Sequence, residues 1–424
     1  MASILYICYL GLSEPLVQTQ VIPYLAGLTR AGHRVVLLTF DPTAFTDVQR
    51  RAHKTALGNL YIEWHSLRYH KRPALPATLV DVMAGILYGA FLIRKNHIDV
   101  VHGRSHVGAA VAVCLKWLLG PRVVFDMRGL LAEEYVDAGL WREGGYLYRL
   151  TKAIERVLLA KSDALVLLTQ RVRQWLLDRE AGENKQSPVA VIPCCVDLRR
   201  FDVDPAQAQR VRKNLGLDGH PVMVYAGKVG GWYMTREMID FFRVAGRYLP
   251  GLRFLVLTQS AVSMIKAQFA RENISQRLYR CLSVSPRDLP AYLSAADFAI
   301  SFIRPSLSKI ASSPTKMAEY LAAGLPVVYN AGIGDLDGLQ SDRVGVLVTR
   351  FRGVAYRRAA RELWGFLDDR RGTALRCRRV AETRFGLATV GVPRYLELYA
   401  ALQDATAGDG GRAGTRLRAD GRMN

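Results

Sequence analysis

The sequence predicts an α/β protein made of two Rossmann-like domains that face each other across a cleft. Short β-branched apolar runs alternate with helical segments, which is typical of parallel sheets covered by helices on both faces. The pattern restarts after a polar stretch near residue 200. At 424 residues the chain is also too long for one ordinary hydrophobic core.

The first half is expected to form an N-terminal domain over residues 1–200. Its apolar runs predict strands at 4–10, 34–39, 60–64, 100–101, 123–126 and 164–168. Helical spacing predicts helices at 17–31, 79–95, 107–119 and 146–160. Ligands of such open sheets bind at the carboxyl ends of the strands, so functional residues are expected directly after them.

The second half is expected to form a C-terminal domain over residues 201–390. Strands are predicted at 222–225, 253–257, 298–301, 326–329 and 344–348. A last helix, 391–403, is expected to pack back towards the N-terminal domain. Residues 404–424 lack an apolar period and are expected to be a disordered tail.

The strong positive charge admits three kinds of partner. The net charge is +21 and the pI is near 9.9, which suits nucleic acid, an anionic membrane or a polyanionic substrate. The basic residues are spread along the chain without a dense arm or a stripe of alternating aromatic residues, so we expect no nucleic acid partner. An arginine-rich composition with no single patch is the alternative explanation.

Cysteine usage and the N-terminus favour a cytoplasmic protein. The six cysteines form no CxxC pair, which fits a reducing compartment. The start, "MASILYICYLGLSEP", has no basic region and reads as a buried strand instead of a signal peptide. The apolar run 79–93 is shorter than the roughly 20 residues of a membrane span, so no span is expected. No histidine and carboxylate spacing indicates a metal site.

One stretch, "SSPTKMAEYLAAGLPVVYNAGIGD" (312–335), predicts an anion site. A helix is expected to begin near Lys316, and the first turn of a helix presents free N–H groups and a positive dipole end. Ser313 and Thr315 add hydroxyl groups. Glu319 lies one turn further along the same face, where its carboxylate can accept hydrogen bonds from a ribose diol. A capped helix with a solvated glutamate is the alternative.

This stretch resembles the donor-site segment of retaining GT-B-fold glycosyltransferases that use nucleotide sugars. Those enzymes include the "glycosyl transferases group 1" type, which builds bacterial cell-surface polysaccharides. Further segments follow in the order found in that family: "GLSEPLVQTQVIPYLAGLTRAGHRVVLLTF", "VVHGRSHVGAAVAVCLKWLLGPRVVFDMRG", "VIPCCVDLRRFD" and "VYAGKVGGWYMTREMIDFF". The resemblance covers about the first 400 residues.

The resemblance implies donor-binding residues in the C-terminal domain. Gly227 and Lys228 match the position whose basic residue neutralises the donor diphosphate. The next loop, which begins at Gly230, lacks the second basic residue, and Lys316 or Lys309 is expected to compensate. Val284 lies where backbone groups meet the base.

The family often has two glutamates spaced E-x7-E, and this chain departs from that pattern. Glu319 matches the second, ribose-binding glutamate. The first position is Ala311, so the identity of the donor sugar stays open.

The N-terminal domain is expected to hold the acceptor. Gly11 and Gln18 belong to a loop that resembles the one beneath the donor phosphates. His102, Arg104, Asp126 and Arg128 follow predicted strands and are the candidate catalytic residues. Asp126 is expected to orient the acceptor hydroxyl group, although the alternative is that Asp126 and Arg128 only bridge a loop.

The family mechanism retains the anomeric configuration. The leaving phosphate helps to take the proton, and the protein supplies positioning and electrostatic stabilisation. No cofactor and no metal ion are expected, because lysines and helix-end amides neutralise the diphosphate.

A peripheral position on the inner face of the plasma membrane is a further expectation. Residues 68–95 begin basic, turn apolar and end basic, which suits an interface with anionic lipids. An internal helix whose charged ends reach solvent is equally compatible.

The expected function is hexosyl transfer to a lipid-linked or cell-envelope glycan. The alternatives are a nucleotide-sugar epimerase with the same fold and a non-enzymatic polyanion-binding protein.

Overall fold

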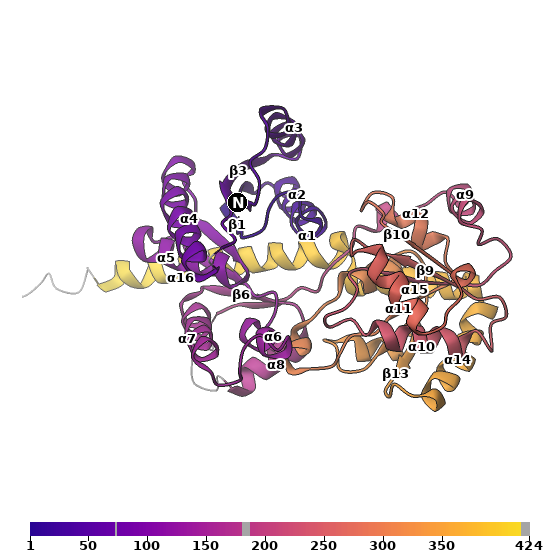
Figure 1. Cartoon of the computed structure of the whole chain (residues 1–424). Coiled ribbons are helices and arrows are strands. Elements are labelled where there is room, and N and C mark those ends of the chain that lie inside the picture. The colour runs from indigo at the N-terminus through magenta and orange to yellow at the C-terminus, as the bar shows by residue number, and fades with distance from the viewer. Residues whose placement is uncertain (73, 180–186, 417–424) are drawn as a thin grey trace, which may run out of the picture.

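Two α/β domains make up the protein (Figure 1). The structure is a computed structural model that describes residues 1–72, 74–179 and 187–416. Each domain is built on one parallel sheet. The structure therefore confirms the two predicted sheets and the helices on both faces of each sheet.

The N-terminal sheet has seven strands in the order β3-β2-β1-β4-β5-β6-β7. The strands are β1 (Ser3–Cys8), β2 (Arg34–Asp41), β3 (Ile62–Arg68), β4 (Val100–Arg104), β5 (Arg122–Asp126), β6 (Ala164–Leu167) and β7 (Val189–Val191). The strand order reverses between β1 and β4, so their carboxyl ends border a crevice suited to ligands.

Helices cover both faces of this sheet because successive strand residues point to opposite sides. In β1, Ile4 and Tyr6 enter one core, whereas Leu5 and Ile7 enter the other. The first core also takes apolar residues of α1 (Pro15–Gln20), α2 (Ile22–Arg30) and α3 (Asp47–Gly58). The second takes those of α4 (Ala74–Asn96), α5 (Ser105–Leu119), α7 (Tyr146–Lys161) and α8 (Gln170–Arg179). A short helix, α6 (Leu131–Asp137), lies after β5.

The C-terminal sheet repeats the same topology with six strands in the order β10-β9-β8-β11-β12-β13. The strands are β8 (Val222–Ala226), β9 (Arg253–Leu257), β10 (Tyr279–Leu282), β11 (Phe298–Ser301), β12 (Val327–Asn330) and β13 (Gly345–Val348). Its helices are α9 (Pro205–Leu215), α10 (Thr235–Ala245), α11 (Val262–Arg271), α12 (Leu289–Ser294), α13 (Thr315–Ala322), α14 (Gly353–Asp368) and α15 (Arg370–Phe385). The short helices are η1 (Leu198–Phe201), η2 (Gln276–Leu278), η3 (Leu307–Ala311), η4 (Leu336–Gln340) and η5 (Leu387–Gly391).

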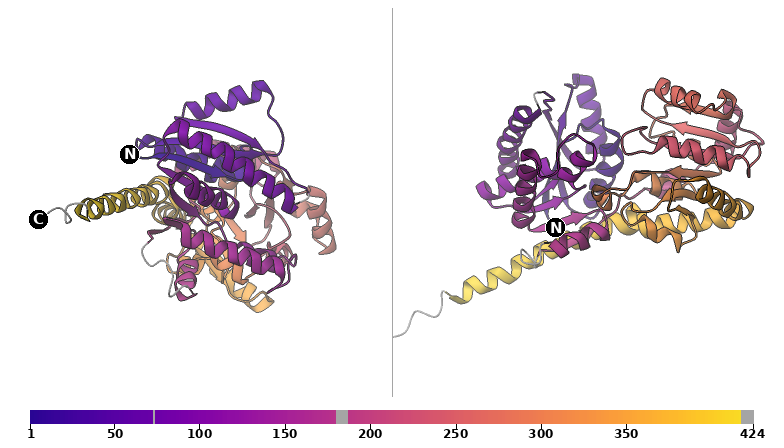
Figure 2. Two further views of the ribbon diagram at one scale, coloured as in Figure 1. Left: turned by 90° about the vertical axis from the view of Figure 1, so that its left-hand side faces the viewer. Right: turned by 60° about the horizontal axis from the view of Figure 1, so that its bottom comes forward.

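The last helix, α16 (Val392–Arg416), leaves the C-terminal domain and runs along the N-terminal one (Figure 2). Tyr395, Leu398 and Tyr399 are buried in the N-terminal core. The helix continues to Arg416, beyond residue 403, where the last helix was expected to end. No proline interrupts this segment, so no backbone N–H group is lost from the helix there. Residues 417–424 lie outside the described residues.

Two other expectations differ from the structure. The helix expected over 17–31 is broken into α1 and α2 at Val21, whose φ is −125°, because Pro23 has no N–H group to donate to the carbonyl four residues earlier and its ring crowds that carbonyl. The edge strand β7 was not predicted, and no bounds were predicted for β10. They are three and four residues long, and Arg280 interrupts the apolar run of β10, whereas the four-residue strands that were predicted are mostly apolar.

Helix α4 is longer than the apolar run expected at 79–93. Residues Leu75–Asn96 are long and apolar enough to cross a membrane by length and composition, although 39% of the most apolar window is buried inside the protein. The helix packs closely at its glycines: a Cβ atom at Gly89 would lie 2.8 Å from Leu115 Cδ1. Asp81, which is fully buried, accepts hydrogen bonds from Tyr9 Oη (2.7 Å) and from the His70 backbone (3.0 Å).

Candidate active site

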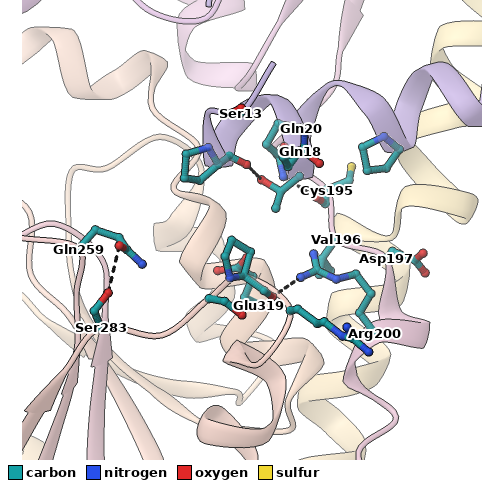
Figure 3. A pocket seen from close by; sticks show the side chains of 16 residues that line it. Ser13, Gln18, Gln20, Cys195, Val196, Asp197, Arg200, Gln259, Ser283 and Glu319 are labelled. Atoms are coloured by element: carbon teal, nitrogen blue, oxygen red, sulfur yellow. Dashed lines mark hydrogen bonds between the residues drawn. The ribbon is translucent and has the colours of Figure 1, made fainter. Parts of the chain in front are cut away.

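A cavity of about 900 Å³ lies between the two domains, beyond the carboxyl ends of the strands. Gln18 and Gln20 line it from the N-terminal domain, opposite Glu319, Gln259 and Ser283 of the C-terminal domain (Figure 3). The remaining lining residues are Ser13, Pro15, Thr19, Pro23, Cys195, Val196, Asp197, Arg200, Ser285, Pro286 and Arg287.

Glu319 lies on α13 and faces this cavity. Burial raises the pKa of its carboxyl group, while Arg200 and Lys316 act in the opposite direction. The Arg200 guanidinium donates a hydrogen bond to the Pro286 carbonyl oxygen at 2.6 Å, which fixes it in the cavity wall. The wall therefore offers a hydrogen-bond acceptor at Glu319 and a fixed positive charge at Arg200.

Lys316 is buried behind this wall, in a cage of aromatic rings. Its Nζ donates to Tyr225 Oη at 3.0 Å and lies 3.8 Å from the centre of the Tyr233 ring. A Cβ atom at Gly227 would lie 2.6 Å from Lys316 Nζ, and the φ of Gly227 is +141°, so glycine is needed there. Burial lowers the pKa of Lys316 to about 7, although Glu319 acts to raise it.

The lowered pKa of Lys316 predicts how the affinity for a nucleotide sugar depends on pH. A bound diphosphate favours the ammonium form of Lys316, so its pKa rises in the complex and binding takes up a proton. Donor affinity should therefore be highest below pH 7 and fall as the pH rises through 7, by up to about tenfold per pH unit. Calorimetry in buffers of different ionisation enthalpy measures both effects.

The matched control for that prediction is Lys228→Ala, which removes an exposed lysine. It should retain the pH dependence, whereas Lys316→Met should remove it. A wild-type affinity that stays constant between about pH 6 and pH 8.5 would contradict the proposed role of Lys316.

The other donor residues expected from the sequence surround the cavity without lining it. Lys228 is exposed, and Gly230 takes a φ of +81° in the same loop. Thr315 is the first residue of α13. The Ser313 hydroxyl group accepts a hydrogen bond from the Cys194 N–H at 3.0 Å and so joins the domains. The Val284 carbonyl oxygen accepts one from Gln259 Nε2 at 2.8 Å.

Lys309 has a partner on the other domain. Its Nζ lies 3.5 Å from Glu134 Oε1 of α6 and 3.8 Å from the centre of the Trp232 ring. Lys309 therefore contacts Glu134 and Trp232, and its role as a compensating donor cation stays a prediction. Neighbouring Ala311 is buried in the same core as N-terminal residues, so η3 anchors one domain on the other.

The N-terminal loop contributes one of its two expected residues to the cavity. Gln18 lines it, and its Nε2 donates to the Leu12 carbonyl oxygen at 2.7 Å, which braces the loop. Gly11 instead lies against β2: a Cβ atom there would lie 2.9 Å from Asp41 Oδ1 and from Pro42 Cδ. The close approach at Gly11 is thus to the protein itself.

The expected catalytic residues form a buried network at the ends of β4 and β5. Asp126 Oδ2 lies 3.3 Å from Arg104 Nη1 and 3.7 Å from His102 Nε2. Asp126 Oδ1 lies 3.2 Å from Arg128 Nη1. The other ring nitrogen of His102, Nδ1, lies 2.8 Å from the Tyr399 hydroxyl group of α16. The network therefore ties the last helix to the sheet.

Asp126 and His102 are fully buried. Burial opposes the ionisation of Asp126, but Arg128, His102 and Arg104 together hold its pKa well below the usual range. Burial lowers the pKa of His102. Arg104 and Arg128 reach a separate cavity of about 250 Å³. This geometry makes Asp126 a positioning group for the two arginines and gives it no surface for an acceptor.

Sequence reasoning missed several residues that line the main cavity. Arg200 belongs to the segment "VIPCCVDLRRFD", but nothing in that segment distinguishes it from the adjacent Arg199. Gln259 follows β9, so its position after a strand was a usable signal. Arg287 lies in an irregular loop without such a signal. No group of three or more His, Cys, Asp or Glu side chains within the described ranges is placed to hold a metal ion.

Two Rossmann-like domains with a cavity between them define a GT-B fold. Residues 17–200 match the family described as Glycosyltransferase Family 4. The chain is 27% identical over 193 residues to 2-deoxystreptamine glucosyltransferase of Streptomyces kanamyceticus. That match covers 44% of this chain and 47% of the relative, so it spans about half of each protein.

Solved GT-B structures resemble the whole chain. A glycosyltransferase from Rickettsia africae has a TM-score of 0.71 at 14% identity, with 95% of this chain and 98% of that chain covered. Anabaena HepE in complex with UDP-glucose has a TM-score of 0.67 at 16% identity, with 94% and 100% covered. WaaG, a glycosyltransferase of lipopolysaccharide biosynthesis, has a TM-score of 0.66 at 14% identity, with 93% and 98% covered. These likenesses establish the fold.

Proposed function

We propose that the protein is a retaining glycosyltransferase that moves a hexose from a nucleotide-diphosphate sugar to a lipid-linked or cell-envelope glycan, without a metal ion. The observation that carries this proposal is the cavity between the domains, with Glu319 on its wall and Lys316 one turn earlier on the same helix. The spacing suits a nucleotide diphosphate whose ribose meets Glu319 and whose phosphates meet the start of α13.

In the proposed reaction the protein positions the reactants and stabilises the leaving group. The acceptor oxygen bonds to the anomeric carbon on the face from which the diphosphate leaves, and the bond from that carbon to the phosphate oxygen breaks. A diphosphate oxygen takes the acceptor proton. Lys316, Lys228 and the free amides of α13 stabilise the negative charge of the diphosphate, and Arg104 and Arg128 orient the acceptor.

The composition of the cavity wall favours this reaction over sugar epimerisation. An epimerase needs acid and base groups in the cavity. The acidic residues that line the cavity are Asp197 and Glu319, and Asp197 is paired with Arg199 at 2.8 Å. Asp126 has no exposed surface. A single unpaired carboxyl group is insufficient for proton removal from one face and return from the other.

A thermal-shift screen against UDP, GDP, ADP and their sugars tests the donor site. UDP-glucose is the first donor to test because HepE was solved with it. A ligand present at 100 times its Kd should stabilise the protein by about 2.7 kcal/mol. The donor that binds should then be hydrolysed or transferred without added metal, with EDTA as the control. No shift with any nucleotide, alongside salt-sensitive polyanion binding, would favour the non-enzymatic alternative.

Helix α4 is the proposed contact with an anionic membrane that holds the acceptor, on the cytoplasmic face. Its outer side exposes large apolar side chains, including Leu79, Met83 and Leu87, the last 69% exposed. Basic residues flank them at both ends, as expected for a helix lying at an interface.

We therefore expect the protein to float with anionic liposomes at moderate salt, and Met83→Glu/Leu87→Glu to abolish flotation without lowering the melting temperature. The matched control is Val354→Glu, a substitution of another exposed apolar residue on α14 of the C-terminal domain. Wild-type protein that remains with the unbound fraction would contradict the membrane contact.

A further inference from the structure

A third cavity, of about 340 Å³, lies between α7 and α8, and none of its lining residues lines the other two. Its wall is strongly basic. The residues that matter for its chemistry are Arg149, Lys152, Arg156, Arg179, Trp175 and Glu155.

Two glutamates beside this cavity, Glu155 and Glu133, already have partners. Glu155 is buried, and its carboxylate lies 2.9 Å from His106 Nε2 and accepts a further hydrogen bond from Lys152. Lys152 Nζ also lies 3.1 Å from Glu133 Oε1. Lys152 thus pairs with both glutamates, and His106 contacts Glu155.

The three arginines have no such compensation. Among residues 1–72, 74–179 and 187–416, no carboxylate forms an ion pair with Arg149, Arg156 or Arg179. All three are exposed. Arg149 and Arg156 are two turns apart on the same face of α7. The Arg179 guanidinium stacks 4.2 Å from the centre of the Trp175 ring, an arrangement that leaves its N–H edges free for a ligand.

We propose that this cavity binds a phosphate-bearing ligand through Arg149, Arg156 and Arg179. A guanidinium group donates two parallel hydrogen bonds to phosphate oxygens, and such charge-assisted bonds are the strong ones. A ligand with two or more negative charges matches these three arginines, which form no ion pair with a carboxylate of the described residues. The small volume of the cavity, about 340 Å³, favours a small phosphate group over a long nucleic acid strand, which needs an extended basic groove.

Because Trp175 stacks on Arg179, its NMR signal can report ligand binding in this cavity. The protein contains six tryptophans, so protein labelled with 5-fluorotryptophan gives a small set of ¹⁹F resonances, and Trp175→Phe identifies the one from Trp175. Inorganic pyrophosphate should shift that resonance saturably, because it binds the guanidinium group that stacks on the ring. Pyrophosphate bound in the cavity between the domains leaves the Trp175 signal unchanged, so failure here is distinct from failure of the proposed sugar transfer.

Arg149→Ala/Arg156→Ala should raise the half-saturating pyrophosphate concentration at least about tenfold. The matched control is Arg173→Ala, which removes an exposed arginine of α8 that does not line the cavity, and it should stay within about twofold. A Trp175 resonance that pyrophosphate does not shift, or an equal response in both variants, would overturn the proposal.

A displacement experiment with lipid vesicles identifies the source of the phosphate. If phosphatidylglycerol vesicles displace pyrophosphate from the wild-type protein, the ligand is a lipid headgroup. If they do not, it is a soluble phosphate. Each result supports the site, and the two differ only in what fills it.

Discussion

Replacing Asp126 by asparagine is expected to destabilise the N-terminal domain by about 3–5 kcal/mol, because removal of one partner of a buried ion pair leaves its charges uncompensated. Arg104 and Arg128 would both lose the carboxylate that lies within 3.3 Å of each of them. The loss of stability should extend to the last helix, because His102 lies beside Asp126 and its ring shares a hydrogen bond with the Tyr399 hydroxyl group of α16.

The contribution of Asp126 should also depend on pH in a defined direction. Its pKa is depressed in the folded protein, so its stabilisation is complete above the unfolded value of about 3.9. That stabilisation is lost as the pH falls through the lower folded value. At neutral pH the wild-type protein therefore retains the full stabilisation from Asp126. The difference in the free energy of unfolding between wild type and Asp126→Asn should become smaller only at acidic pH.

Urea unfolding followed by circular dichroism measures this loss, and hydrogen exchange of β4 and β5 localises it. Asp178→Asn is the control, because Asp178 is an exposed residue that accepts one hydrogen bond from Gln174 and should change stability by less than about 1 kcal/mol. Equal midpoints for Asp126→Asn and wild type would show that the network does not support the domain.

Replacing Glu319 by alanine is expected to raise the KM for the donor by about 10- to 100-fold, with a smaller change in kcat. Hydrogen bonds from a ribose diol to a charged acceptor contribute about 1.5–3 kcal/mol. They form in the ground state and in the transition state alike, so their loss mainly weakens binding. Because burial raises the pKa of Glu319, donor affinity should also fall on acidification at a higher pH than for an ordinary glutamate.

The control for Glu319→Ala is Asp197→Asn, which changes the other carboxylate of the cavity wall. Asp197 is already paired with Arg199, so its replacement should leave the KM within about threefold. Initial rates and calorimetry with the same nucleotide sugar give both quantities. A Glu319→Ala protein with unchanged KM and unchanged donor Kd would show that the ribose does not meet this residue.

The sequence by itself determined the architecture and the main acidic residue of the candidate donor site. Strand and helix alternation predicted both sheets, because buried parallel strands are continuous apolar runs and need no partner to be identified. The residues Lys316 and Glu319 were found from their spacing at the start of a helix, which is a local property. Bounds for the edge strands β7 and β10 were not predicted, because β7 has only three residues and Arg280 interrupts the apolar run of β10.

Only the tertiary structure decided what each of those residues contacts. It buried Lys316 among tyrosines, paired Lys309 with Glu134 across the domains, and enclosed Asp126 between two arginines. Arg200 became a cavity residue because it reaches Pro286 from another part of the chain. Burial and long-range pairing arise when segments far apart in the sequence meet in space, so no local sequence pattern predicts them. Hydrophobic periodicity and the residues at helix ends, in contrast, can be identified within a few consecutive residues.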